Sequence, residues 1–186
     1  MNRRLVGVDL GGTNIRAALA TGESSHGTPV QRPTPAGGGP EAVLDAVAGA
    51  VAAAAEGSCP DGVAVGLPGP LDPESGTVHA APHLAGWMDI PARDLLSERT
   101  GCPVVIENDA NLAGYAEWLF GAGRGTRQFV FITVSTGIGG ALVLDGQPFG
   151  GVAGTAGEVG HIPVSPSGAA CSQGHVGCLD GVASGT

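Results

Sequence analysis

Potentially reactive side chains are concentrated near the end of the chain, between residues 157 and 180. This stretch reads GEVGHIPVSPSGAACSQGHVGCLD and holds two cysteines, two histidines and two carboxylates. Thiolate and imidazole are the ligands that Zn²⁺ prefers, and close cysteines are typical of a structural zinc site. Carboxylates and imidazoles also bind the hydroxyls of polar substrates. The sequence therefore leaves open a metal site, an active site, or one region that serves as both.

A second candidate for chemistry is Asp109. It follows the apolar run PVVIEN and precedes an amphipathic stretch, so we expect it at the carboxyl end of a strand, where ligands bind in open α/β sheets. There it could accept a proton from a substrate hydroxyl, and Asn108 beside it offers both a donor and an acceptor. The alternative is that Asp109 only caps the following helix.

Two glycine-rich turns form a third candidate, because each lies between two strand-like runs. Closely spaced backbone N–H groups in such turns can cradle phosphate oxygens, and a carboxylate next to them can hold a hydrated Mg²⁺. The alternative is that each glycine pair merely closes a β-hairpin. The candidate residues for binding a nucleotide cofactor are Asp9, Gly11, Gly12, Thr13, Ser135, Thr136, Gly137 and Gly139.

The elements that must position these residues follow from hydrophobic periodicity and from Gly and Pro punctuation. Expected strands cover residues 3–10, 14–20, 27–33, 62–70 and 103–109 and the two arms around the turn at 135–140. Expected helices cover residues 41–57, 91–101 (with Pro91 in the first turn) and 110–123. The order strand, glycine turn, strand therefore occurs twice, once near each end of an α/β chain.

Composition excludes several classes of partner. The 186 residues are 42% hydrophobic, enough for a sizeable core, and carry a net charge of −9, which disfavours nucleic acid and anionic membranes. No apolar run has the length of a signal peptide or a membrane span, so we expect a cytoplasmic protein. Cys59 and Cys102 stand apart from the other cysteines, and we interpret them as small buried hydrophobic residues.

Seven segments together resemble the ROK family of sugar kinases and sugar-responsive repressors, and most closely its bacterial glucokinases. They occur in the family's order between residues 6 and 185: VGVDLGGTNIRAAL, GLPGPLD, GWMDIPARDLL, ENDANLAGYAEWLFGAGRG, STGIGGALVLDG, GEVGHIPV and GCLDGVASG. The resemblance implies a ribonuclease H-like or actin-like ATPase fold whose two lobes clasp a nucleotide, with the second lobe incomplete. We expect the first lobe to cover residues 1–118 and the second to cover 119–186.

The resemblance also implies an activity and its residues. The activity is ATP-dependent phosphorylation of a hexose, with glucose first, at its 6-hydroxyl, with Mg²⁺ as the nucleotide's metal and Asp109 as the base. The implied substrate-binding residues are Asn108, Glu158, His161, Asp180, Gly69 and His83. The implied structural Zn²⁺ would be held by His161, Cys171, Cys178 and His175. A homo-oligomer is expected for the full-length protein.

Three residues depart from the family pattern. Gln173 takes the place of the second cysteine of the zinc loop, so the fourth ligand is either His175 or an oxygen of Gln173 or water. Asp180 replaces a glutamate and is one methylene shorter, which puts its reach to the sugar in doubt. His83 replaces an asparagine near the expected sugar site, which could change the hexose that fits.

Two other functions stay open beside the kinase. A ROK regulator would bind sugar without phosphorylating it, but it needs a DNA-binding domain ahead of Asp9, where this sequence has eight residues. An inactive sugar binder is the second alternative, because the chain stops where a further helix should begin. We expect a fragment of a longer protein that, alone, does not phosphorylate hexoses and self-associates through exposed apolar strands.

Overall fold

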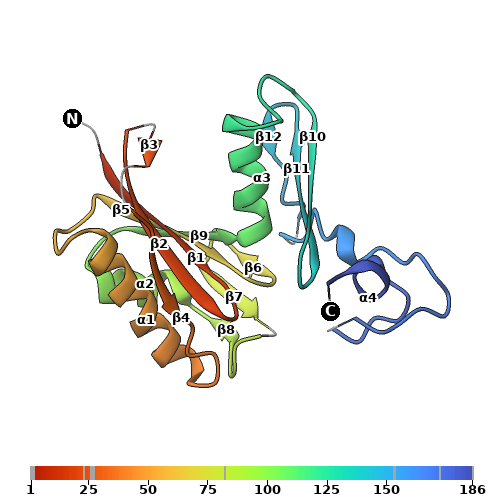
Figure 1. Cartoon of the computed structure of the whole chain (residues 1–186), viewed down its shortest axis with the longest axis horizontal. Helices are drawn as coiled ribbons and strands as arrows, with labels where there is room; N and C mark the ends of the chain where they lie inside the picture. The colour runs from red at the N-terminus through yellow and green to blue at the C-terminus, as the bar shows by residue number, and fades with distance from the viewer. Residues whose placement is uncertain are drawn as a thin grey trace. The chain divides into compact units, whose positions relative to one another are not determined.

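The computed structural model describes residues 3–22, 24–25, 28–81, 83–152, 154–171 and 173–185. The chain divides into two compact units, Met1–Asp109 and Ala110–Thr186 (Figure 1). The boundary expected from the sequence lies after residue 118, within helix α3 (Asp109–Phe120), whereas the compact units divide after the first residue of that helix. The rest of α3 belongs with the second unit because it packs on the sheet there.

A six-stranded mixed sheet forms the centre of the first unit, and its path runs β3-β2-β1-β5-β9, with β4 also paired to β2. Strand β1 is antiparallel to β2 and parallel to β5, which is in turn parallel to β9. The bounds are β1 Arg4–Leu10, β2 Asn14–Thr21, β3 Ser24–Ser25, β4 Val30–Pro33, β5 Gly62–Leu67 and β9 Val104–Asn108. The strand expected at 27–33 is confirmed over Val30–Pro33, and residue 27 lies outside the described residues.

Two helices, α1 (Gly39–Ala54) and α2 (Ala92–Thr100), lie together against the sheet of this unit (Figure 1). Alternate residues of β1, namely Val6, Val8 and Leu10, are buried in the same core as the helices. This alternation is the reason that the sequence predicted the strand. Leu5, Gly7 and Asp9 alternate with them and lie on the opposite face of the sheet, where Leu5 is 43% exposed.

The helix boundaries differ from the expected ones in detail. Helix α1 begins earlier than predicted, with Pro40 in its first turn, and it ends at Ala54, three residues before the predicted stop at Gly57. Pro91 is the N-cap of α2 and not a residue of its first turn. A small sheet of β6 (Leu71–Asp72), β7 (Thr77–Ala80) and β8 (Met88–Ile90) was not predicted, because strands this short carry no readable period.

The second unit is built on a three-stranded antiparallel sheet, covered on one face by α3. Its strands are β10 (Phe129–Val134), β11 (Ile138–Leu144) and β12 (Gln147–Pro148). The helix lies so close that a Cβ on Gly114 would clash with the side chain of Ala141. The other face of β10 leaves Val130, Ile132 and Val134 more than half exposed. A 3-10 turn η1 (Val159–His161) and a short helix α4 (Leu179–Ala183) complete the unit.

Within the described residues, no helix is both long enough and apolar enough to cross a membrane.

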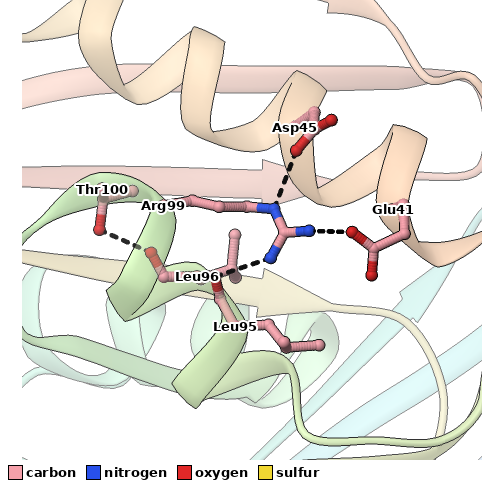
Figure 2. A network of polar contacts seen from close by, with 6 residues as sticks. All are labelled: Glu41, Asp45, Leu95, Leu96, Arg99 and Thr100. Carbon is pink, nitrogen blue, oxygen red and sulfur yellow. Dashed lines mark hydrogen bonds and ion pairs between the residues drawn. The ribbon is translucent and has the colours of Figure 1, made fainter.

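Arg99 joins the two helices of the first unit (Figure 2). Its Nε donates to Asp45 Oδ1 at 2.9 Å and its second amino group pairs with Glu41, both on α1, while Nη1 donates to the Leu95 carbonyl of its own helix at 3.0 Å. The hydrogen bond that Arg99 donates to Asp45, followed by the charges of both carboxylates, raises the pKa of Arg99 despite its burial. The guanidinium therefore fixes the distance between α1 and α2.

We predict that Arg99→Met destabilises the first unit by about 1 kcal/mol, because both carboxylates are solvent-exposed and such pairs are weakened by water and salt. Urea unfolding followed by circular dichroism measures the change. Arg127→Met is the control, since the Arg127–Asp145 pair is exposed on both sides, and its effect should stay below about 0.5 kcal/mol. Equal effects of the two substitutions would contradict the conclusion that Arg99 holds α1 and α2 together.

Candidate functional site

The first glycine turn joins β1 to β2 and is held by backbone and side-chain hydrogen bonds. Gly11 N–H donates to the Asn14 carbonyl at 2.9 Å, which closes the turn. Thr34, directly after β4, also holds the turn: its N–H donates to Thr13 O at 2.9 Å and its hydroxyl to Gly11 O at 2.7 Å. The sequence did not single out Thr34. Its only signal is its place directly after the third strand.

The carboxylate of Asp9 lies on the solvent-exposed face of β1, one residue before the turn begins. Its Oδ2 lies 3.4 Å from Nη1 of Arg16, the residue directly opposite on β2. Both side chains are more than half exposed. A hydrated Mg²⁺ at Asp9 would therefore compete with a weak, solvent-screened ion pair.

His83 touches this first turn. A Cβ placed on Gly12 would lie 3.0 Å from His83 Cβ, so residue 12 has no room for a larger side chain unless His83 moves. His83 is exposed. The structure thus brings the unusual histidine to the same turn that the sequence predicted to bind phosphate.

The carboxyl ends of the parallel strands bring the other candidates of the first unit together. Asn108 ends β9, pairs in register with Leu67 of β5, and donates from its amide nitrogen to the Gly69 carbonyl at 3.3 Å. Gly69 has φ 86°, and a Cβ there would clash with the Ala80 carbonyl, so only glycine fits. Asp109 follows as the half-buried first residue of α3. The expected strand-end placement of Asp109 is therefore what the structure shows.

The second glycine turn, between β10 and β11, is held by hydrogen bonds to Asp180 and Gly185. Ile138 N–H donates to Asp180 Oδ1 at 2.6 Å, and this contact is buried. Gly185 N–H donates to the Ser135 carbonyl at 2.8 Å. Asp180, in the first turn of α4, is 7% exposed and is the buried charged residue of the described chain. The predicted sugar ligand Asp180 thus also holds the backbone of the predicted phosphate turn, a role that the sequence did not reveal.

The segment carrying Glu158 and His161 packs directly on β11. A Cβ on Gly160 would clash with the Ile138 carbonyl, and one on Gly157, at φ 97°, would lie 2.6 Å from the Gly140 carbonyl. The two glycines therefore allow the segment to approach a strand backbone that leaves no room for side chains. This contact places η1 beside the second turn.

His161 has a polar neighbour near each of its ring nitrogens. Its Nε2 lies 3.7 Å from Glu158 Oε2, and its Nδ1 lies 3.9 Å from Cys171 Sγ. One imidazole thus faces the carboxylate of the predicted sugar site and the thiol of the predicted zinc site at the same time.

Three potential metal ligands cluster in the second unit. The donor atoms of His161, Cys171 and His175 all lie within 4.8 Å of one another. The two imidazole rings are packed edge to face, with their centroids 5.1 Å apart. Ligands around tetrahedral zinc stand about 3.5 Å apart, so this set needs only a small contraction to bind the ion. The residues present fit the group in donor type and in spacing.

The fourth predicted ligand, Cys178, is buried beside this cluster but is not one of its members. Its Sγ lies 3.8 Å from the His175 carbonyl oxygen. Burial raises the pKa of the Cys171 thiol, but hydrogen bonds from the backbone of Gln173 and His175 and from Cys178 outweigh it and lower that pKa overall. Backbone N–H groups directed at a sulfur favour the thiolate, which is the form that binds metal.

The model of the ROK family matches residues 5–186 of this chain. The glucokinase of Thermotoga maritima is 39% identical over 183 residues, a match that covers 98% of this chain and 58% of that protein. A solved structure, a ROK family glucokinase from Streptomyces griseus in complex with glucose and AMPPNP, is 38% identical with a TM-score of 0.88 and covers 98% of this chain and 57% of its own. The chain therefore spans about 58% of the length of the curated relative.

The chain is also similar to a transcriptional repressor. The xylose repressor of Caldicellulosiruptor bescii is 37% identical over 123 residues, which cover 66% of this chain and 31% of the repressor. The kinase structures share the actin-like ATPase fold that the sequence resemblance predicted. With a family model that matches nearly the whole chain and relatives that match it from end to end, this protein belongs to the ROK family.

Proposed function

We propose that this chain carries the base and phosphate-binding turns of an ATP-dependent hexose kinase, with glucose as the first candidate substrate and its 6-hydroxyl as the acceptor. The observation that carries the proposal is the strand-end pair Asn108–Asp109, held against Gly69 in the same unit as the first glycine turn. A carboxylate beside an amide at this position suits a sugar hydroxyl. The relatives named glucokinase support the same function.

In the proposed reaction, the carboxylate of Asp109 accepts the proton of the attacking hydroxyl. The oxygen of that hydroxyl then bonds to the γ-phosphorus of ATP, and the bond to the β–γ bridging oxygen breaks to release ADP. In this proposal, the residues of the two turns bind the phosphates, and Asp9 would hold the hydrated Mg²⁺. Asn108, Gly69 and His83 from the first unit bind the sugar.

The second unit supplies further proposed sugar contacts through Glu158 and His161. Hydrogen bonds between a hydroxyl and a charged group contribute about 1.5–3 kcal/mol each, enough to select among hexoses. Asp180 is a weaker candidate for this role, because one of its oxygens already accepts from Ile138 N–H. We also propose that His161, Cys171, Cys178 and His175 would hold a structural Zn²⁺, which would fix the orientation of the His161 ring.

The alternative function is sugar sensing without phosphorylation, which the similarity to a xylose repressor favours. The two functions differ in the product: a kinase releases ADP when a hexose is added, and a sensor or an inactive sugar binder does not. A coupled ADP-release assay over glucose, mannose, fructose and N-acetylmannosamine, on a full-length version of the protein, distinguishes them. Sugar binding without ADP release for any of these hexoses would contradict the kinase proposal.

We predict that Asp109→Asn in the full-length protein lowers kcat by about 10²–10⁴-fold, because an amide cannot accept the proton, while sugar affinity changes only a few-fold. Steady-state kinetics and isothermal titration with the sugar measure the two effects. Asp94→Asn, an exposed carboxylate on α2, is the matched control and should leave both unchanged. An Asp109→Asn variant that retains most of its turnover would remove Asp109 from the role of base.

We predict that Asp180→Ala raises KM for ATP about 10-fold or more, since it removes the acceptor that holds Ile138 N–H and leaves that buried donor unpaired. Asp180→Asn keeps an acceptor oxygen and should preserve most of the affinity for ATP. If Asp180 instead acts as a charged sugar ligand, both variants will raise KM for the sugar to a similar extent and leave KM for ATP unchanged.

We predict that His175→Ala weakens zinc binding about 100-fold or more, because His175 is the nearest replacement for the thiolate that Gln173 lacks. Competition with a chelating indicator gives the affinity, and elemental analysis gives the zinc content per chain. Gln173→Ala is the control and should change neither. Loss of zinc from Gln173→Ala, with full zinc in His175→Ala, would assign the fourth position to Gln173 instead.

A further inference from the structure

Two thiols outside the proposed site face one another in the first unit. Cys59 lies in the loop between α1 and β5, and Cys102 lies in the turn between α2 and β9. Their sulfur atoms are 3.3 Å apart although the residues are 43 positions apart in the chain. Because β5 and β9 are parallel neighbours, both cysteines lie at the amino ends of adjacent strands.

The backbone around this pair is well fixed. Val63 N–H donates to the Pro103 carbonyl at 2.9 Å, so the two strand entrances are joined directly beside the thiols. Pro60 and Pro103 follow the two cysteines and restrict the backbone on each side. The short distance between the sulfurs therefore follows from sheet register and not from the chance position of a mobile loop.

The two thiols differ in their access to solvent. Cys102 is 4% exposed and its thiol donates to the Thr100 carbonyl at 3.1 Å. Cys59 is exposed, which corrects the expectation that both residues are buried. That expectation failed because burial of a loop residue depends on neighbours that are distant in sequence. A reagent in solution can reach Cys59 first.

We propose that Cys59 and Cys102 are a site of reversible oxidation, at which a small-molecule disulfide such as oxidised glutathione converts the two thiols into an intramolecular disulfide. The bond requires the sulfurs to approach from 3.3 Å to about 2.05 Å, a shift that side-chain rotation can supply. This pair is not used in the proposed kinase chemistry, and it is separate from the zinc-binding cysteines.

The reaction proceeds in two balanced exchange steps. Cys59 loses its proton, and its thiolate attacks one sulfur of the oxidised reagent, forms a mixed disulfide, and displaces a thiolate that takes up a proton to give one reduced thiol. The sulfur of Cys102 loses its proton and attacks the Cys59 sulfur, which forms the internal disulfide and releases a second reduced thiol. The protein loses two protons and two electrons, and the reagent gains both. Cys59 is the first nucleophile because it is exposed, whereas Cys102 is buried, and burial together with the neighbouring Cys59 raises the pKa of the Cys102 thiol.

The disulfide would join the entrances of β5 and β9, at the opposite ends of these strands from Asn108 and Asp109. Closing a loop of this length restricts the unfolded chain, so the oxidised protein should be more stable. The substrate-binding residues of the first unit lie at the carboxyl ends and stay unbridged. The expected effect is on stability and not on the chemistry of the site.

The test equilibrates the 186-residue chain with mixtures of reduced and oxidised glutathione, blocks the remaining thiols with an alkylating agent, and maps the peptides by mass spectrometry. We expect a Cys59–Cys102 disulfide, its reversal by reduced glutathione, and a melting temperature about 10 °C higher for the oxidised form. Protein in which both thiols remain alkylatable under oxidising mixtures would overturn the proposal. So would a disulfide at Cys171–Cys178 with Cys59 and Cys102 still reduced.

Two variants test the order of attack and keep the result independent of folding. Cys102→Ala should accumulate glutathione on Cys59, because no second thiol resolves the mixed disulfide. Cys59→Ser changes an exposed residue, so the variant should fold, and its Cys102 should stay unmodified. Glutathione retained on Cys59 of the unsubstituted protein, or disulfide-linked dimers in place of the internal bond, would show that the two sulfurs do not react with each other and would overturn the proposal.

Discussion

The buried hydrogen bond from Ile138 N–H to Asp180 is the contact on which the second unit depends. It joins the glycine turn between β10 and β11 to α4, and Cys178 is the N-cap of the same short helix. Leu179 N–H then ties that helix to the Ile162 carbonyl, directly after His161. One helical turn therefore joins the cysteine loop to the backbone that we propose binds phosphate.

In the first unit, the geometry of the sheet positions the candidate site residues. Parallel strands β5 and β9 end level with each other, and Gly69 lets the chain turn so tightly that its carbonyl accepts from the Asn108 amide. A backbone atom thus helps to set the orientation of that amide. Pre-set polar groups of this kind cost little reorganisation when a substrate binds.

The sequence predicted the long elements and the residues at their ends, because burial on one face imposes a period on β1 and α1, and burial on both faces makes β5 a continuous apolar run. It placed Asp109 at a strand end for the same reason. It missed β6 to β8, which are too short to show a period, and it missed the bond between Asp180 and Ile138, which joins residues 42 positions apart. It also misjudged Cys59, whose exposure depends on how the loop before β5 packs. Periodicity in the sequence therefore predicted the long elements, whereas contacts between residues distant in sequence became visible only in the structure.

The shape of the loop around Gln173 would allow His175 to serve as the fourth ligand of the zinc site that we propose. Cys171 N–H donates to the His175 carbonyl and Gly174 N–H to the Cys171 carbonyl, so the chain makes a full turn between residues 171 and 175. That turn carries the His175 ring to the His161 ring. A ligand lost at one position of a tight loop can be replaced from another position, because the loop brings several side chains to one point. If Cys178 moved to complete the set, two imidazoles and two thiolates would leave bound Zn²⁺ neutral.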